Sequence, residues 1–434
     1  MGPDSRTIWR FSPYPAGMRI RGVLAGILVW TLALSTSSLC SDLALVHAKI
    51  YVSPTDPPIE DGTILVHNGS IRAIGPSAKV KVPRFARAVT VLDCQNRVVT
   101  AGFWNSHVHI LTPGLLRAEK QSSAEISSQL DRMFTRWGFT TVFDIASVLD
   151  NTNNIRRRVA AGQVHGPRIL TVGEPFYPKG GTPIYVKGFL EENHIPPAEV
   201  ESAPQAVERV RRQIRDGADG IKIFAGSITG NGVLPMPTDL AKAIVSEAHR
   251  AGKPVFAHPS NAEGIEVAIQ SGVDILAHTA PMSGDWTPDF AERLKAAHLA
   301  LIPTLTLFDV EAKKAKVSAE ENEMWIKQAV QELKAFSDAG GEVLFGTDVG
   351  YIEQSDTTEE FQLMARAGMN FQKILASLTT NPATRFGYSS RAGRIAKGMD
   401  ADLVVLKDDP ARDVTAFSRV DQVIRGGKLI YSVR

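Results

Sequence analysis

The feature that most constrains the fold is an alternation of short apolar runs with longer helical patterns between residues 100 and 385. The runs with the length and composition of buried strands are Val98–Ile110, Thr140–Ile145, Arg168–Val172, Gly220–Phe224, Pro254–His258, Ile275–His278, Ala300–Leu305 and Val343–Asp348. Helical patterns such as Thr238–Ala251, Asn261–Ser271 and Ala319–Ala339 lie between them. Such repetition favours a parallel α/β fold, the (β/α)8 TIM barrel, over an open doubly wound sheet. The Pro- and Gly-rich segment 176–204 is expected to form a long loop over the active face.

Both flanks of this region have the short, turn-punctuated runs of antiparallel β-structure. On the N-terminal side these runs are Ala44–Val52, Gly62–His67, Ser70–Ile74 and Val89–Leu92; on the C-terminal side they are Asp402–Leu406, Val420–Arg425 and Lys428–Tyr431. We therefore expect a small composite β-sandwich domain from residues 42–99 and 386–434, and a barrel domain from residues 100–385.

The N-terminus has the three-part pattern of a secretory signal peptide within residues 1–41. Arg19 and Arg21 supply positive charge, Gly22–Leu34 is uncharged and apolar, and Ser35–Ser41 is mostly small and polar. The apolar run is shorter than the roughly 20 residues of a membrane-spanning helix. The pattern predicts a start near Met18, an upstream extension before it, and a secreted or periplasmic protein without a membrane span after cleavage. The alternative is an uncleaved N-terminal membrane anchor.

Composition narrows the class of partner. The chain is 44% hydrophobic and 22% charged, with a net charge of +2, which is typical of a soluble enzyme and argues against a nucleic-acid partner. Cys40 and Cys94 are its two cysteines. Signal cleavage near residues 38–41 would leave Cys94 as the main thiol, so no disulfide framework is expected.

His107 and His109 lie two residues apart at the end of the first expected strand, so their side chains should point to the same side. Further residues with metal-ligand chemistry lie in or at the ends of later strands, where a barrel places its active site. They are Lys222, His258, His278 and Asp348. A lone strand-end His or Asp is usually structural, but this set together supplies the N and O ligands that suit zinc, with manganese, cobalt and iron left open.

Lys222 is the most informative of these residues. Strand alternation places Ile221 and Ile223 outward against helices, so Lys222 points into the barrel. An unpaired buried ammonium is costly, and burial lowers a lysine's pKa. A neutral amine reacts with CO2 to give an anionic carbamate, N6-carboxylysine, whose two oxygens can bridge two cations.

On these residues the chain resembles the amidohydrolase superfamily of metal-dependent hydrolases, in the branch of imidazolonepropionase-related enzymes and Xaa-Pro dipeptidases. The pattern is His-x-His on strand one, Lys on four, His on five and six, and Asp on eight; the segment 393–406 is similar to the family's C-terminal signature. Asn105 departs from the Asp that many members have there, at a position that is not a ligand. The resemblance implies two divalent cations, most simply zinc. Its implied ligands are His107, His109 and Asp348 for the inner cation, His258 and His278 for the outer cation, and carboxylated Lys222 between them.

The implied reaction is hydrolysis of an amide or peptide-like C–N bond in a small molecule by a metal-activated hydroxide, with Asp348 as general base and then acid. A dipeptide is one candidate substrate. A deaminase and a lactone or ester hydrolase are alternatives on the same scaffold, and a catalytically silent binding barrel is a remote one. Asn261 argues against a deaminase, because deaminases on this scaffold resemble one another in having a glutamate at that place.

Substrate selection in such barrels comes from the loops that follow the strands. The expected contributors are Tyr177, Tyr185, Asn231 and Tyr351, with Lys179 as a partner for a substrate carboxylate. Loop packing is the alternative role for any one of them. The sequence leaves open the substrate, the number of metals and whether the chain forms a homo-oligomer.

Overall fold

The computed structural model of the chain describes residues 42–82 and 89–433. The predicted signal peptide, residues 1–41, lies outside these ranges. Within the ranges described, none of the helices has both the length and the apolar character needed to cross a bilayer.

Within the described ranges, eight strands form the two larger parallel sheets. The first has the order β6-β7-β8 and the second has the order β11-β14-β15-β16-β17. Their bounds are β6 Phe103–Val108, β7 Phe139–Asp144, β8 Arg168–Thr171, β11 Ile221–Phe224, β14 Val255–His258, β15 Ile275–Leu276, β16 Ala300–Leu301 and β17 Glu342–Val343. Chain order matches spatial order within each sheet, as expected for strands joined by helical crossovers.

Backbone hydrogen bonds connect the edges of these two sheets. Ser106 N in β6 donates to Phe345 O beyond β17 at 2.7 Å, and Asp219 N before β11 donates to Thr171 O in β8 at 2.6 Å. One apolar cluster contains side chains from both sheets, among them Trp104, Phe143, Leu170, Phe256, Ile275 and Ala300. The two sheets therefore share one core within a mixed α/β fold.

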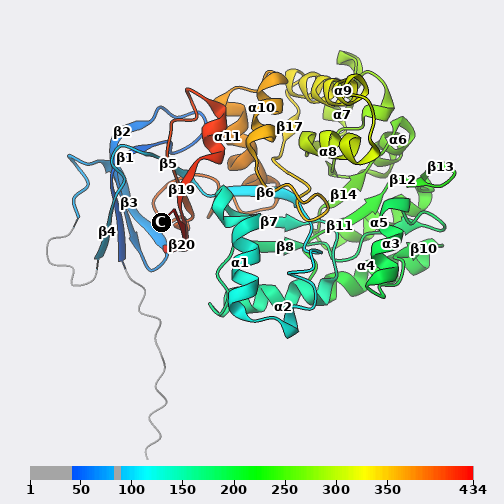
Figure 1. The fold of residues 1–434 in the computed structure, drawn as a ribbon, viewed down its shortest axis with the longest axis horizontal. Coiled ribbons are helices and arrows are strands. Elements are labelled where there is room, and N and C mark those ends of the chain that lie inside the picture. The colour runs from blue at the N-terminus through cyan, green and yellow to red at the C-terminus, as the bar shows by residue number, and fades with distance from the viewer. Residues whose placement is uncertain (1–41, 83–88, 434) are drawn as a thin grey trace, which may run out of the picture. The chain divides into compact units, whose positions relative to one another are not determined.

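Helices separate the parallel strands along the chain and pack around them (Figure 1). They are α1 Ser123–Met133, α2 Leu149–Ala160, α3 Ile184–Glu192, α4 Ala203–Arg215, α5 Thr238–Arg250, α6 Ala262–Ser271, α7 Pro288–Ala296, α8 Leu305–Ala315, α9 Ala319–Asp338, α10 Thr358–Arg366, α11 Phe371–Leu378 and α12 Thr380–Arg385. Short 3-10 turns are η1 Ala118–Lys120, η2 Thr135–Trp137, η3 Pro281–Ser283 and η4 Val414–Ser418. The helices cover the outward side chains of the strands: Ile221 and Ile223 join Val210 of α4 and Ile244 of α5 in one core cluster.

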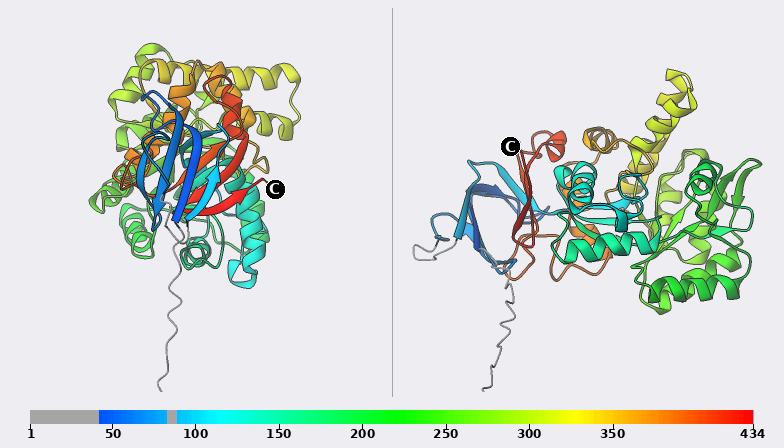
Figure 2. Two further views of the ribbon diagram at one scale, coloured as in Figure 1. Left: turned by 90° about the vertical axis from the view of Figure 1, so that its left-hand side faces the viewer. Right: turned by 60° about the horizontal axis from the view of Figure 1, so that its bottom comes forward.

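Residues 42–101 and 403–432, the outer segments of the described part of the chain, build one eight-stranded sheet, in which blue N-terminal and red C-terminal strands lie together (Figures 1 and 2). Its strands are β1 Asp42–Ile50, β2 Ile59–His67, β3 Ser70–Pro76, β4 Val89–Asp93, β5 Val98–Ala101, β18 Leu403–Leu406, β19 Val420–Arg425 and β20 Lys428–Ser432. The decisive pairing joins β5 to β18, antiparallel, with Leu403 opposite Ala101. A separate apolar cluster, including Leu45, Ile64, Val99 and Val405, forms the core of this sheet.

Three predictions about the elements need correction. The expected strand Val98–Ile110 is two strands, because the chain passes at Gly102 from the terminal sheet to the parallel one. A Cβ there would lie 2.2 Å from Thr140 Oγ1, so the close approach requires glycine. The segment 176–204 is not a plain loop, since it contains β9 (Tyr177–Pro178), α3 and β10 (Glu199–Val200). The expected strand Ala300–Leu305 stops at Leu301, and α8 begins at Leu305.

Candidate metal centre

The structure brings the predicted ligands together at the carboxyl ends of the parallel strands. His107 lies in β6 and His109 directly after it, Lys222 lies within β11, His258 ends β14, His278 follows β15, and Asp348 lies in the turn after β17. Backbone contacts fix that turn against β6: Asp348 N donates to His107 O at 2.9 Å. Gly350 passes so close that a Cβ would lie 1.8 Å from His109 O.

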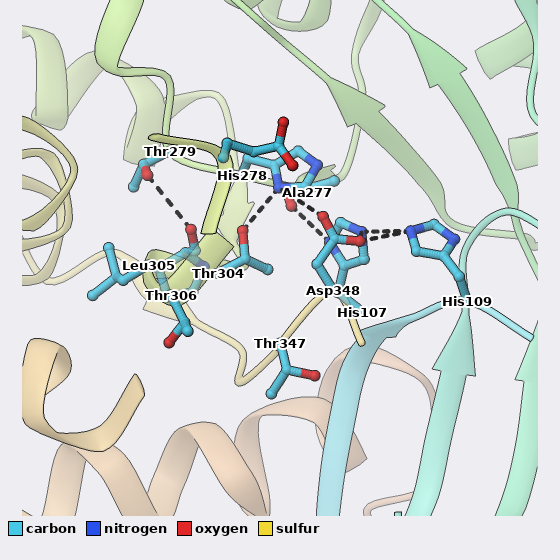
Figure 3. A network of polar contacts seen from close by, with 12 residues as sticks. His107, His109, Ala277, His278, Thr279, Thr304, Leu305, Thr306, Thr347 and Asp348 are labelled. Atoms are coloured by element: carbon cyan, nitrogen blue, oxygen red, sulfur yellow. Dashed lines mark hydrogen bonds and ion pairs between the residues drawn. The ribbon is translucent and has the colours of Figure 1, made fainter. Parts of the chain in front are cut away.

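Three ligand atoms form a tight triangle at this end. His107 Nε2 lies 3.3 Å from His109 Nε2, and Asp348 Oδ1 lies 3.2 Å from the first and 2.8 Å from the second. All three side chains are buried, with 0%, 9% and 3% of their surface exposed (Figure 3). Despite these short distances, Asp348 Oδ1 has no hydrogen-bond partner within residues 42–82 and 89–433.

The hydrogen bond made by the Nδ1 atom of each ring determines which nitrogen carries the proton. His107 Nδ1 donates to Ala277 O at 2.8 Å, and His109 Nδ1 donates to Ala146 O at 2.8 Å. A carbonyl oxygen only accepts, so both Nδ1 atoms carry the proton and both neutral rings keep a lone pair on Nε2. Two imidazole lone pairs and a carboxylate oxygen that face one another fit a bound cation.

Electrostatics keep His107 neutral but favour a proton on His109 as long as no cation is bound. Burial lowers the pKa of His107 to about 4, so this ring is neutral at neutral pH. Burial also opposes the charged form of His109, but the Asp348 carboxylate and the Ala146 carbonyl raise its pKa overall. Burial opposes ionisation of Asp348 as well, yet His107 and His109 hold its pKa well below the ordinary value. A proton on His109 Nε2 and a metal cation therefore compete for the position next to the Asp348 carboxylate.

His278, His258 and Lys222 extend the site from the triangle. His107, His278 and Asp348 offer ligand atoms that all lie within 4.8 Å of one another. The His278 ring lies 4.5 Å from that of His107 and 4.7 Å from that of His258, measured between centroids. Burial holds the pKa of both His258 and His278 well below the usual range, which keeps the rings neutral.

Lys222 is buried, with 2% of its surface exposed, as strand alternation predicts. Burial lowers the pKa of its amine to about 7, with the more distant Asp348 charge opposing. Its Nζ lies 5.7 Å from the Phe224 ring centroid, and the described residues give it no carboxylate within 4.0 Å. A neutral amine is therefore well populated at physiological pH.

Sequence comparison decides the family. The family model described as the amidohydrolase family matches residues 98–430. The chain belongs to the amidohydrolase family. It is therefore a hydrolase, as the sequence predicted. Ochratoxinase of Aspergillus niger is 24% identical over 434 residues, covering 89% of this chain and 86% of that protein. Imidazolonepropionase of Clostridium tetani is 21% identical, covering 86% and 91%. In structure, an Xaa-Pro dipeptidase with bound methionine is similar with a TM-score of 0.77 at 23% identity, covering 91% of this chain and all of that one.

Residues that the sequence did not reveal hold the histidines of this amidohydrolase in place. Asn105 Nδ2 donates to Thr347 Oγ1 at 2.7 Å and its Oδ1 accepts from His107 N at 3.2 Å, so it ties β6 to the turn that holds Asp348. Buried Asp144 accepts from Ile110 N, next to His109, at 3.2 Å. Asp144 also accepts from Thr152, Thr171 and Ser147, which fixes the segment that supplies Ala146 O. Strand spacing has no signal for these contacts.

His278 has a separate support (Figure 3). Its Nδ1 lies 2.8 Å from the hydroxyl of Thr304, a fully buried residue with a φ of +44°. Positive φ is unusual for a β-branched residue and marks a strained position. The buried Glu360 carboxylate accepts from Leu305 N at 2.9 Å and Thr306 N at 2.8 Å, the first amides of α8, and so anchors the backbone next to Thr304.

Aromatic side chains lie beside the centre. Tyr177 packs edge-on against Phe224 at 4.7 Å, and Phe224 stacks on His258 at 4.6 Å between centroids. Tyr185 meets Tyr351 at 5.5 Å. Burial raises the pKa of both Tyr185 and Tyr351, and the Asp348 charge contributes to each shift, so these phenols are neutral donors near the ligands.

Two of the residues predicted to contact the substrate lie on exposed segments. Asn231 is exposed at the turn of the β12–β13 hairpin (Gly226–Thr229 and Gly232–Pro235). Lys179 is exposed and forms an ion pair with Glu201 at 3.1 Å. In the described ranges neither residue contacts the histidines, and their part in substrate binding stays a prediction.

Proposed function

We propose that this amidohydrolase hydrolyses a C–N bond of a small amide with the help of divalent cations. The proposed ligands are His107, His109, His258, His278, Asp348 and carboxylated Lys222. The observation that carries the proposal is the triangle of His107, His109 and Asp348, whose lone pairs face one another in a buried site. Zinc suits these N and O donors, and manganese, cobalt or iron would also suit them.

Lys222 is proposed to be N6-carboxylated. Its neutral amine attacks the carbon of CO2, a C–N bond forms, and the nitrogen releases a proton to leave a carbamate anion. The low pKa of Lys222 and its lack of a carboxylate partner support this step. A carbamate would replace a poorly paired buried amine with an anion that could bind the proposed cations.

The cations supply Lewis acidity toward a substrate carbonyl and toward water. Asp348 is ionised, since His107 and His109 hold its pKa low, and it therefore can take a proton. Its Oδ1 faces the two histidines, which leaves Oδ2 to accept a proton from water and deliver it to the leaving nitrogen. Tyr351 is proposed to donate a hydrogen bond to the substrate, because it follows Asp348 by three residues and its phenol stays neutral.

We further propose that the two parallel sheets form a (β/α)8 barrel and that the terminal sheet forms a β-sandwich domain. Hydrogen bonds at both junctions and the shared core cluster support the barrel. Apolar residues from strands at both ends of the chain support the second domain. The proposed boundaries are 42–99 plus 386–434 for the sandwich and 100–385 for the barrel, and the proposed location is secreted or periplasmic, from the signal pattern in residues 1–41.

The proposed substrate is a dipeptide or N-acyl amino acid. The neighbouring tyrosines and Phe224 suit an apolar or aromatic group, and similarity to ochratoxinase and to an Xaa-Pro dipeptidase points to the same class. A deaminase is disfavoured because Asn261 caps α6 by accepting from Gly264 N at 3.0 Å, which leaves no proton-shuttling carboxylate at that position.

The test measures metal content and turnover of the purified chain. Metal per chain is determined by inductively coupled plasma mass spectrometry, and a library of dipeptides and N-acyl amino acids is screened for released amine. We expect bound divalent metal, and its loss together with activity in His107→Asn. His249→Asn is the matched control, because His249 is exposed and pairs with Asp274 away from the site. A wild-type chain that binds no metal and turns over no amide would overturn the proposal.

A further inference from the structure

A second feature of the molecule lies away from the metal centre. A cavity of about 510 Å³ opens where β8 begins, and its charged lining consists of four arginines and one aspartate. The arginines are Arg156 and Arg157 of α2, Arg168 of β8 and Arg425 of β19; the aspartate is Asp216. This volume lies in the range of small-molecule sites.

The cavity is at the opposite end of the parallel strands from the proposed ligands. Arg168 is the first residue of β8, whereas His109 follows the last residue of β6, and β6, β7 and β8 run parallel. A molecule bound beside Arg168 therefore would not occupy the position of the hydrolysed substrate. This inference is independent of the proposed function.

The arginines differ in how fully the protein satisfies them. Arg156 is occupied, since it pairs with Asp219 at 3.1 Å and donates to Gly217 O at 2.9 Å. Arg168 pairs through Nη2 with Asp400 at 3.0 Å, and Asp402 lies 3.7 Å from the same atom. Its Nη1 is buried and has no hydrogen-bond partner among the described residues.

Arg425 and Arg157 have still fewer partners. Arg425 donates to Gly166 O at 2.9 Å, and the described residues place no carboxylate within 4.0 Å of it. Burial lowers the pKa of Arg425; the Asp402 and Asp400 carboxylates oppose this shift, and the like charge of Arg168 adds to it. Arg157 is exposed, and no hydrogen bond or ion pair joins its side chain to the described part of the chain.

These observations describe an open pocket in which Asp216, Asp219, Asp400 and Asp402 balance the charge of the four arginines, and in which Arg157 and the Nη1 atom of Arg168 are left without a partner among the described residues. A guanidinium group with free donors can bind an anion, because its planar fork matches the geometry of two oxygens on one phosphorus or carbon atom. Tyr388 adds a flat wall: Arg168 lies 5.2 Å from its ring centroid, and the ring also borders a second cavity of about 310 Å³. An organic group attached to the anion therefore has space beside it.

We propose that this cavity binds a small molecule through a doubly charged oxyanion group, either a phosphate or a pair of carboxylates, held by Arg157, Arg168 and Arg425.

The experiment titrates the purified full chain with inorganic phosphate and, separately, with malonate, by isothermal calorimetry in a phosphate-free buffer. We expect binding of at least one anion. Arg425→Gln should weaken it about tenfold or more, because a charge-assisted hydrogen bond is lost from a mostly buried site. Arg157→Gln should weaken it about threefold, since an exposed charge contributes less. Arg132→Gln, an exposed arginine of α1 outside the cavity lining, is the matched control and should bind as the wild type does.

The anions distinguish the two sources of the chemistry. Binding of phosphate alone supports a phosphate ester, binding of malonate alone supports a dicarboxylate, and binding of both supports recognition of a dianion. Binding of neither overturns the proposal. An affinity that is equal in the wild type, Arg157→Gln and Arg425→Gln also overturns it, because the anion would then bind elsewhere, for instance at the metal centre. Arg157→Gln keeps the test valid if Arg425→Gln does not fold, because its side chain supports no other residue.

Discussion

Replacement of Thr304 by valine tests whether a residue outside the ligand set controls metal binding. Thr304 is fully buried, its hydroxyl lies 2.8 Å from His278 Nδ1, and its φ is +44°. Valine has the same shape without the hydroxyl, so the backbone strain stays and only the hydrogen bond disappears. The hydroxyl can donate to or accept from the ring, and in either case it fixes which His278 nitrogen keeps a lone pair for a cation.

The expected magnitude follows from the burial of the pair. A buried polar group left without its partner costs about 1–3 kcal/mol, and loss of an outer partner of a metal-ligating histidine weakens metal binding by about 10–100-fold. Thr304→Val should therefore show this loss of affinity. Thr304→Ser retains the hydroxyl and removes the β-branch, which relieves part of a strain of about 1–3 kcal/mol. It should bind metal as the wild type does, with unchanged or higher stability.

Two measurements separate positioning from a general structural effect. Metal affinity is measured by competition with a chromogenic chelator, and the visible absorption of the cobalt-loaded protein reports the geometry of the ligands. We expect Thr304→Val to shift the cobalt bands and Thr304→Ser to leave them unchanged. Equal affinity and identical cobalt spectra in Thr304→Val and the wild type would refute the reasoning. An equal loss of metal affinity in Thr304→Val and Thr304→Ser would also refute it.

Three further outcomes are expected. Lys222→Ala should lower metal content from about two cations per chain to about one or fewer and reduce hydrolysis further, because the proposed bridge is gone; undiminished metal and activity would contradict it. Burial raises the pKa of Glu360 from its ordinary 4.5 to about 7, so the folded state holds a proton that the unfolded state releases, and stability should fall by up to about 3 kcal/mol as pH rises from 4.5 to 7. Urea unfolding of Glu360→Gln at several pH values should lack that slope, and parallel curves would count against the assignment. Tyr351→Phe should raise KM about two- to tenfold with little change in kcat if the phenol binds the substrate in both ground and transition states, whereas an unchanged KM would remove Tyr351 from the substrate site.

The candidate site was largely predictable because strand periodicity is local. Residues two apart on a strand share a side, and His107 and His109 indeed bring their Nε2 atoms to 3.3 Å. The same alternation predicted that Lys222 is buried between two isoleucines that face the helices, as it is. Asp348 was predictable only as the polar end of an apolar run; its φ of +63° and its turn against His109 come from the packing of the segment after β17 on β6.

Other parts of the site could not be predicted, because they depend on groups that every residue has or on contacts between distant segments. The proton positions on His107 and His109 are set by the carbonyl oxygens of Ala277 and Ala146, and a backbone carbonyl has no signature in the sequence. The β12–β13 hairpin, which holds Asn231 at an exposed turn, also depends on how two segments pair. The helix α3 within 176–204 was hidden by the surrounding prolines and glycines.

The sequence by itself determined the number and order of the parallel strands, the face on which each chemical group lies, and the family, because these follow from periodicity and spacing along the chain. Only the tertiary structure decided that β5 pairs with β18 across some 300 residues of chain. It also decided that Thr304 and Glu360 support His278, and that four arginines, from one helix and two strands, line one cavity. The physical reason is the same in each case: the atoms involved come close only after the chain has folded, and nothing in their local sequence records that distance.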